Sequence, residues 1–137
     1  MGAQPPRYRF ALNPHRPLRF SACSDCGAKT KLRKLPLVIH VDGFGLVTLG
    51  KTCRLCVSCE ILVAHQDEID PLIQNLVGVT RPLPDYLVLG TADRTFWRRG
   101  LRGPQPLAEL IQNMADFKEH LRLEYTPGGW FPADQRR

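Results

Sequence analysis

The sequence predicts a single α+β domain in which an antiparallel sheet, made of two β-hairpins, packs against two helices. Three observations support this fold class. The chain has 137 residues, of which 43% are hydrophobic and 23% charged, and this suits one domain with its own core. Two segments show the strand–turn–strand pattern of hairpins. Near the C-terminus, apolar residues recur at the three- and four-residue spacing of an amphipathic helix.

The first 21 residues are expected to form an extended arm before a domain that covers residues 22–137. The arm combines prolines with arginines, a composition that opposes helix formation. Because apolar residues alternate within it, parts of the arm are expected to pair as edge strands. The residues concerned are Pro5, Pro6, Pro14 and Pro17, with Arg7, Arg9, Arg16 and Arg19.

The first hairpin follows from two apolar runs around a glycine-containing turn. Residues 37–41 predict one strand, residues 42–45 (Asp-Gly-Phe-Gly) a turn, and residues 46–49 the returning strand. The next apolar run, residues 60–64, is either a third strand or the start of a helix. Its four consecutive apolar residues do not decide between these two.

A short helix and the second hairpin are expected next. Asp70 followed by Pro71 is typical of a helix N-cap and first helical position, and Gly78 is a typical helix stop. After a proline-containing connector, residues 86–89 predict a strand and residues 94–98 its partner.

The C-terminal part is expected to be helical. An amphipathic helix is predicted over residues 106–123, so that the second hairpin and this helix together occupy about residues 84–125. The tail from residue 126 to residue 137 is expected to be irregular. The apolar face of the helix would consist of Leu107, Leu110, Ile111, Met114, Phe117 and Leu121.

The five cysteines fall into two groups that indicate a metal site. In a chain that begins without an apolar leader, grouped Cys-x-x-Cys pairs favour metal binding over disulfides. Two intervening residues turn the backbone so that both sulfurs face one ion, about 2.3 Å away. We therefore expect a structural Zn²⁺. Iron is the alternative metal, although the chain lacks the Cys-Pro ending of common ferredoxin runs.

Three cysteines of the second group compete for two ligand positions. After the second cysteine of a metal-binding turn the backbone often has a positive φ, which Gly27 adopts easily after Cys26. The β-branched Val57 resists that conformation more strongly than Glu60. We therefore expect the ligands to be Cys23, Cys26, Cys56 and Cys59, with Cys53 as an alternative.

The order of cysteine turn, hairpin, cysteine turn and apolar strand over about residues 20–66 resembles a zinc ribbon. The motifs Cys23-x-x-Cys26-Gly27 and Cys56-x-x-Cys59 carry this resemblance, which implies a ribbon part at about residues 22–66 around the metal. A treble-clef finger, whose last ligands start a helix, is the alternative and would suit Cys53 and Cys56. Residues 35–42, 51–56 and 65–68 are also similar to a group of uncharacterised bacterial proteins, which implies no function.

The charge distribution has two interpretations: basic residues beside the cysteines in sequence balance the negative charge of the thiolate site, or the basic segments bind an anionic partner. The residues of the first interpretation are Lys29, Lys31, Arg33, Lys34, Lys51 and Arg54. Residues 1–34 carry eight basic residues and one acidic residue (net +7), whereas residues 60–91 carry one basic and five acidic residues (net −4). Arginine neutralises phosphates and aromatic rings stack on bases, so binding of RNA or DNA is one expected function. The expected contact residues are Arg7, Arg9, Arg16, Arg19, Trp97, Arg98 and Arg99.

The function that the sequence favours is that of a small, non-catalytic zinc-binding protein that serves as a protein-interaction or scaffold module. A second copy of the chain or an unknown protein would be the partner. No apolar run approaches the roughly 18 residues of a membrane span, so we expect a cytoplasmic protein. We do not expect an enzyme, because no nucleophile elbow, phosphate loop or His-Glu-x-x-His motif accompanies His40 or His65 in the sequence. Neither histidine lies at ligand spacing from a cysteine, so neither is expected to bind the metal.

Overall fold

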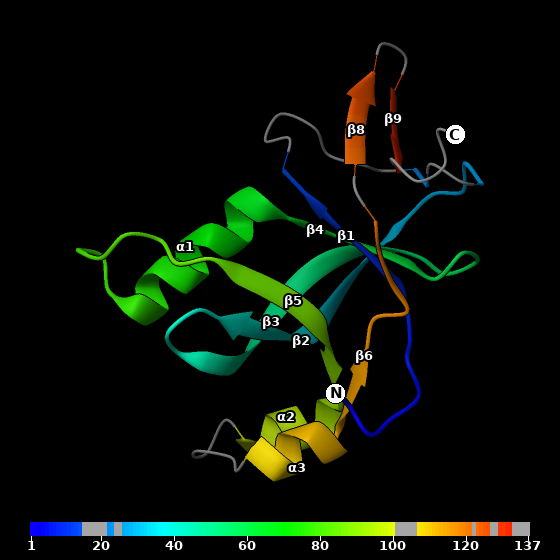
Figure 1. The fold of residues 1–137 in the computed structure, drawn as a ribbon. Helices are drawn as coiled ribbons and strands as arrows, with labels where there is room; N and C mark the ends of the chain where they lie inside the picture. The colour runs from blue at the N-terminus through cyan, green and yellow to red at the C-terminus, as the bar shows by residue number, and fades with distance from the viewer. Residues whose placement is uncertain (15–21, 24–25, 101–106, 122, 127–128, 133–137) are drawn as a thin grey trace.

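The computed structural model of the chain describes residues 1–14, 22–23, 26–100, 107–121, 123–126 and 129–132. Its strands and helices form a mixed α/β fold with one seven-stranded sheet, a separate two-stranded sheet and three helices among the described residues (Figure 1). In chain order the elements are β1 (Arg9–Asn13), β2 (Lys31–Val41), β3 (Gly45–Cys56), β4 (Ile61–His65), α1 (Gln66–Val77), β5 (Tyr86–Ala92), α2 (Arg94–Gly100), α3 (Leu107–Gln112), β6 (Met114–Asp116), β7 (Glu119–Leu121), β8 (Leu123–Thr126) and β9 (Gly129–Pro132).

The seven-stranded sheet is curled, and its two edge strands are consecutive in the chain. The strand order is β6-β5-β2-β3-β4-β1-β7, so β6 and β7 lie at opposite edges. Only Phe117 and Lys118 separate these two strands in the sequence. Their amides donate to the carbonyls of Leu89 and Tyr8, at 2.9 and 2.8 Å. Through these two hydrogen bonds, the connection between β6 and β7 is bonded both to β5 and to Tyr8, the residue before β1.

The N-terminal segment is part of the sheet. β1 pairs in parallel with β4 on one side and with β7 on the other, and Phe10 is only 2% exposed. The predicted edge pairing is therefore wrong, because burial of Phe10 holds β1 between two neighbours. Before β1, the amide of Gln4 donates to the carbonyl of Met114. Residues 15–21 of the predicted arm lie outside the described residues.

The first hairpin is confirmed and is longer than predicted. β2 and β3 pair from Lys31↔Leu55 to Val41↔Gly45. Gly43 and Gly45 have φ values of +82° and +89°, which only glycine adopts without strain. The apolar run after the second cysteine group is a strand, β4, which pairs with β3.

The helix α1 begins earlier than predicted. It starts at Gln66, so Pro71 lies inside the helix and Asp70 is not its N-cap. Proline removes one helix hydrogen bond, but Ile69 and Ile73 are fully buried beneath the helix and this burial outweighs the missing bond. The predicted stop is confirmed at Gly78, whose amide donates to the Gln74 carbonyl at a φ of +106°.

The prediction of a second hairpin is wrong, because residues 94–98 belong to helix α2. The Asp93 carboxylate accepts a hydrogen bond from the Phe96 amide at 2.9 Å and thereby supplies the N-cap. Phe96 is buried with Val38 and Met114. The ring of Trp97 lies over β3, where a Cβ on Gly50 would lie 2.8 Å from it.

The prediction of a single amphipathic helix over residues 106–123 is also wrong. The segment forms the six-residue helix α3 and then the strands β6 and β7, which makes three helices among the described residues where two were predicted. The reason lies in the core, since Met114, Phe117 and Leu121 are buried in three different hydrophobic clusters. One helical face cannot reach all three.

The tail contains a hairpin where irregular structure was predicted. β8 pairs antiparallel with β9 from Leu123↔Pro132 to Thr126↔Gly129. Residues 133–137 lie outside the described residues.

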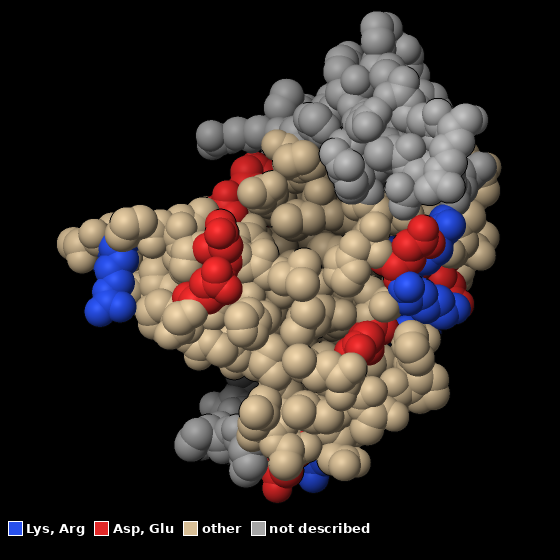
Figure 2. All heavy atoms as spheres, viewed as in Figure 1, with Lys and Arg blue, Asp and Glu red and all other residues tan. Residues whose placement is uncertain are grey.

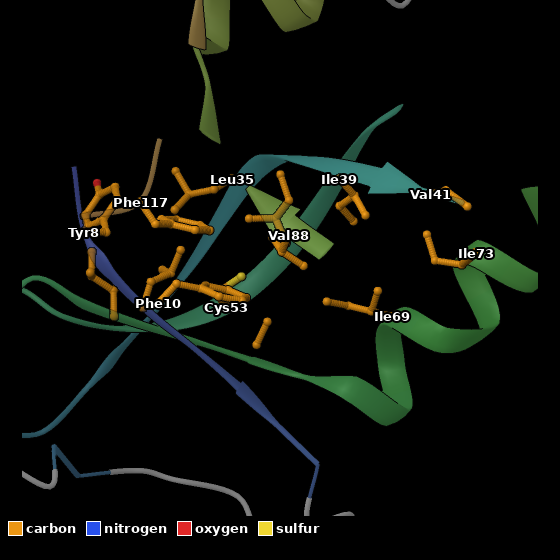
Figure 3. Close-up of a cluster of buried hydrophobic side chains, with 14 of the residues drawn as sticks. Tyr8, Phe10, Leu35, Ile39, Val41, Cys53, Ile69, Ile73, Val88 and Phe117 are labelled. Carbon is orange, nitrogen blue, oxygen red and sulfur yellow. The ribbon is translucent and has the colours of Figure 1, made fainter. Parts of the chain in front are cut away.

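The main core lies within the curled sheet, and α1 covers one end of it (Figure 3). Phe10 stacks on Phe117, with ring centroids 4.5 Å apart and planes at 4°. Since Phe10 comes from β1 and Phe117 from the join between β6 and β7, this pair packs the closure of the sheet from inside. None of the described helices is long and apolar enough to span a membrane.

Candidate metal centre

Four cysteine sulfurs gather at the turn between β3 and β4. Cys23 and Cys26 come from the loop before β2, Cys56 ends β3 and Cys59 lies in the turn before β4. Their sulfur atoms all lie within 4.8 Å of one another. These are the four cysteines that the sequence predicts as metal ligands.

The sulfur spacing suits a tetrahedral metal ion. Four sulfurs placed about 2.3 Å from one zinc ion lie about 3.8 Å apart. The Sγ atoms of Cys26 and Cys56 are 3.6 Å apart, well beyond the roughly 2.05 Å of a disulfide bond. All five cysteines are free thiols. The cluster could therefore hold a metal ion.

Both cysteine turns have the backbone geometry on which the predicted choice of ligands depends. The amide of Gly27 donates to the Cys23 carbonyl at 2.9 Å. Gly27 then has a φ of +73°, and Glu60, directly after Cys59, has a φ of +53°. Val57 has no positive φ, since Tyr8 and Glu60 are the two non-glycine residues with one among the described residues. The local conformation thus directs both pairs of sulfurs to one point.

The cluster lies at the margin of a small apolar core. Cys23 and Cys56 are buried, at 6% and 1% exposure, and pack with a second hydrophobic cluster. Cys59 is half-buried and Cys26 is exposed. An ion bound here would be covered on the protein side and reachable from solvent through Cys26. The apolar cluster consists of Ala11, Ile61, Val63 and Leu121 with these buried cysteines.

The thiols affect one another's protonation. The backbone N–H of Ala28, together with the thiols of Cys56 and Cys59, lowers the pKa of Cys26. Burial, together with the surrounding sulfurs, raises the pKa of Cys59 to about 12. Four neighbouring thiolates repel one another unless a cation neutralises them. The group is therefore suited to bind a cation by releasing protons.

Cys53, the alternative ligand, lies outside the cluster. Three positions separate it from Cys56 along β3, so the two side chains leave opposite faces of the strand. Cys53 is buried in the main core, and its thiol lies 3.5 Å from the Lys51 carbonyl. Burial raises the pKa of Cys53 to about 12, so this thiol remains protonated near neutral pH.

The histidines lie in other environments. The Nδ1 atom of His65 is 3.0 Å from the Asn13 amide nitrogen in the sheet. His40 is half-exposed, with Nδ1 at 3.9 Å from an Asp42 oxygen. His120 lies across the closure of the sheet, where its Nε2 donates to the Val88 carbonyl at 2.6 Å. Neither His40 nor His65 belongs to the thiol cluster among the described residues.

The predicted nucleic-acid contacts lie on separate elements. Arg7 stands 4.7 Å over the ring of Tyr8, and Arg9 is in β1. Trp97 is half-buried against β3, whereas Arg98 and Arg99 are exposed at the end of α2. Arg16 and Arg19 lie outside the described residues.

Two features of the sheet lie outside the binding residues that the sequence predicts. The first is the mainly basic charge of the β2–β3 hairpin, which the sequence shows as five basic residues and one acidic residue within residues 31–56. The second is a hollow of about 370 Å³ beside β3. Its lining comes from three separate chain segments, so no local pattern could have revealed it.

Comparison with known proteins finds no matching family model, no matching curated protein and no matching solved structure. The function of the chain is therefore inferred from its own geometry.

Proposed function

We propose that the chain is a small, non-catalytic zinc-binding protein whose four clustered thiolates hold one structural Zn²⁺. The observation that carries this proposal is the gathering of four sulfurs within 4.8 Å from two separate turns. Soft thiolate ligands in a tetrahedral set favour zinc or iron–sulfur chemistry. Four protein ligands leave no open position for water or substrate, so the ion would have a structural role.

The ion would fasten the loop before β2 to the turn between β3 and β4. Within the loop, the Cys23 amide donates to the Ala28 carbonyl at 2.8 Å and Ala22 forms one isolated bridge with Lys29. Binding of structural zinc contributes on the order of 10 kcal/mol of apparent folding free energy in small domains. Zinc would thus decide whether this end of the sheet is ordered.

Native mass spectrometry combined with elemental analysis tests this proposal. We expect one zinc per wild-type chain, loss of zinc in Cys26→Ser, and full zinc content in the matched control Cys53→Ser. Wild-type protein that is folded and free of metal would refute the metal site. Iron in place of zinc would refute the metal identity, and zinc loss only in Cys53→Ser would refute the ligand set.

An interaction or scaffold role is the biological function that we propose for the zinc-stabilised fold. The face that carries α1 and β5 shows scattered acidic side chains, with basic ones near its margins (Figure 2). This charge distribution complements the basic β2–β3 hairpin and favours self-association or a protein partner. Size-exclusion chromatography with light scattering should show a dimer that high salt weakens. A monomer at all salt concentrations would refute self-association.

Nucleic-acid binding is a second candidate, favoured by the charge of the β2–β3 hairpin. Lys31, Arg33 and Lys34 are exposed, and none of them forms an ion pair with another described residue. A Cβ on Gly50 would lie 2.8 Å from the ring of Trp97 and 3.2 Å from Cε of Lys34. An aromatic ring therefore stands beside the basic strand, as in surfaces that bind single-stranded nucleic acid.

Fluorescence anisotropy with a mixed-sequence oligonucleotide tests this candidate. We expect micromolar binding at low salt that weakens steeply as salt rises. The double variant Arg33→Gln/Lys34→Gln should reduce the salt slope by about 2, because each of the two side chains would neutralise one phosphate. The matched control is Arg81→Gln, an exposed arginine after α1. Absence of binding at low salt, or equal effects of both variants, would refute the candidate.

A further inference from the structure

The hollow beside β3 forms where β3 and β4 separate. The two strands pair only through Arg54↔Val63, Leu55↔Leu62 and Cys56↔Ile61. Beyond this ladder, β4 runs on to His65 and turns into α1, while β3 extends away toward Lys51. The hollow of about 370 Å³ opens between them, a volume at the small end of the range for small-molecule sites.

Among the charged side chains that line this hollow, one positive charge is not balanced by an ion pair. The Nζ atom of Lys51 donates to the Glu68 carboxylate at 2.6 Å and to the Thr52 carbonyl at 2.7 Å. This ion pair is locally neutral. Arg54 is half-buried at the same hollow, and no described residue forms an ion pair or hydrogen bond with its guanidinium group.

The hollow also has an apolar wall. Leu32 is 64% exposed and belongs to the lining of the hollow. Cys53 also belongs to the lining of the hollow, although only 2% of it is exposed. A ligand that covers Leu32 would gain apolar contact while its charged end remains close to Arg54.

We propose that this hollow binds a small organic acid with a single negative charge, such as a carboxylic acid with an apolar body. The carboxylate accepts paired hydrogen bonds from the planar Arg54 guanidinium, a geometry that arginine is suited to provide. Among the residues that line the hollow, one negative charge balances the positive charge of Arg54, which no ion pair compensates. A dianion would bring its second charge toward Glu68. The lining of this site includes none of the four clustered cysteines.

Titration with benzoate and with its neutral analogue benzamide, followed by amide NMR, tests the proposal. The two probes share size and ring, so any difference in affinity reports the negative charge. We expect saturable shifts at Thr52, Arg54 and His65 with benzoate, and binding of benzamide that is at least about tenfold weaker. Equal binding of both probes, or no saturable shift with benzoate at millimolar concentration, would overturn the proposal.

A variant pair adds a second test. Arg54→Gln should weaken benzoate binding about tenfold, whereas Arg81→Gln, which replaces an exposed arginine after α1, should leave it unchanged. Zinc content is measured on the same samples, because Arg54 lies two positions from Cys56. Loss of zinc in Arg54→Gln would show that this arginine serves the metal site and would overturn its assignment as the anion ligand. Equal weakening in both variants would do the same.

Discussion

At the scale of single residues, the direction of each side chain decides which thiols can act together. Cys53 and Cys56 differ by three positions along β3 and therefore point to opposite faces. Cys53 joins the main core and Cys56 joins the thiol cluster. Sequence spacing alone makes these residues look equivalent, but burial gives them opposite chemistry: one is an inert core thiol and the other a proposed ligand.

Glu60 provides a residue-scale prediction because it has a φ of +53° directly after Cys59. Such a conformation strains most side chains but not glycine. Glu60→Gly should therefore be at least as stable as the wild type, whereas Glu60→Val should lose about 1–3 kcal/mol of unfolding free energy. Urea unfolding of the zinc-loaded proteins measures both. If Glu60→Val matched the wild type, the turn would not be strained.

At the scale of elements, helix α1 and strand β5 are linked by one polar contact. The Tyr86 hydroxyl donates to the Asp70 carboxylate at 2.6 Å. Burial, together with the negative charge of Asp70, raises the pKa of Tyr86 above its ordinary value of 10.0. The contact is half-exposed, so we expect Tyr86→Phe to lose about 1 kcal/mol near pH 8.

This stabilisation should disappear in alkaline solution. The unfolded tyrosine ionises near pH 10, whereas the folded one keeps its proton to higher pH. Above about pH 10 the unfolded state therefore binds fewer protons, and the stability of the wild type falls as pH rises. Phenylalanine cannot ionise, so the stability difference between the two proteins should shrink over this range. A difference independent of pH in urea titrations would contradict the proposed contact.

The packing of α2 on β3 supports a second prediction at this scale. A Cβ on Gly50 would lie 2.8 Å from the ring of Trp97, so Gly50→Ala should force the ring aside and cost about 1–3 kcal/mol. In a Trp97→Ala background the same change should be neutral or stabilising, because alanine restricts the unfolded chain more than glycine. A double-mutant cycle by thermal unfolding measures the coupling. The same cost in both backgrounds would refute the contact.

At the scale of the whole molecule, a metal ion in the thiol cluster would fasten the loop before β2, while the curled sheet has its own core and its own closure. Removal of the metal by a chelator should therefore expose the four cluster thiols to alkylation and lower the melting temperature, while Cys53 stays protected until the sheet unfolds. Mass spectrometry after alkylation counts the labelled cysteines at each stage. Labelling of Cys53 together with the other four would mean that the sheet depends on the metal.

The residues that form local turns were the most predictable part of this protein. Gly43 and Gly45 in the first hairpin, Gly27 after Cys26 and Gly78 after α1 all adopt positive φ, because the preference of glycine for such positions depends only on its own backbone. The same local reasoning at Val57 and Glu60 favoured Cys56 and Cys59 over the alternative Cys53, and these two are the ones that join the cluster with Cys23 and Cys26.

Tertiary packing decided the rest. The spacing of Met114, Phe117 and Leu121 fits a helix, yet in the folded chain these residues lie in three different clusters. The closure of the sheet therefore turns this part of the chain into the two short strands β6 and β7. Likewise, the hollow between β3 and β4 combines Leu32, Arg54 and Glu68 from distant positions. The sequence by itself determined the turns and favoured the four clustered cysteines over Cys53, since these features depend on neighbours along the chain. The path of the C-terminal segment and the shape of the hollow depend on contacts between residues far apart in sequence, which only the folded chain brings together.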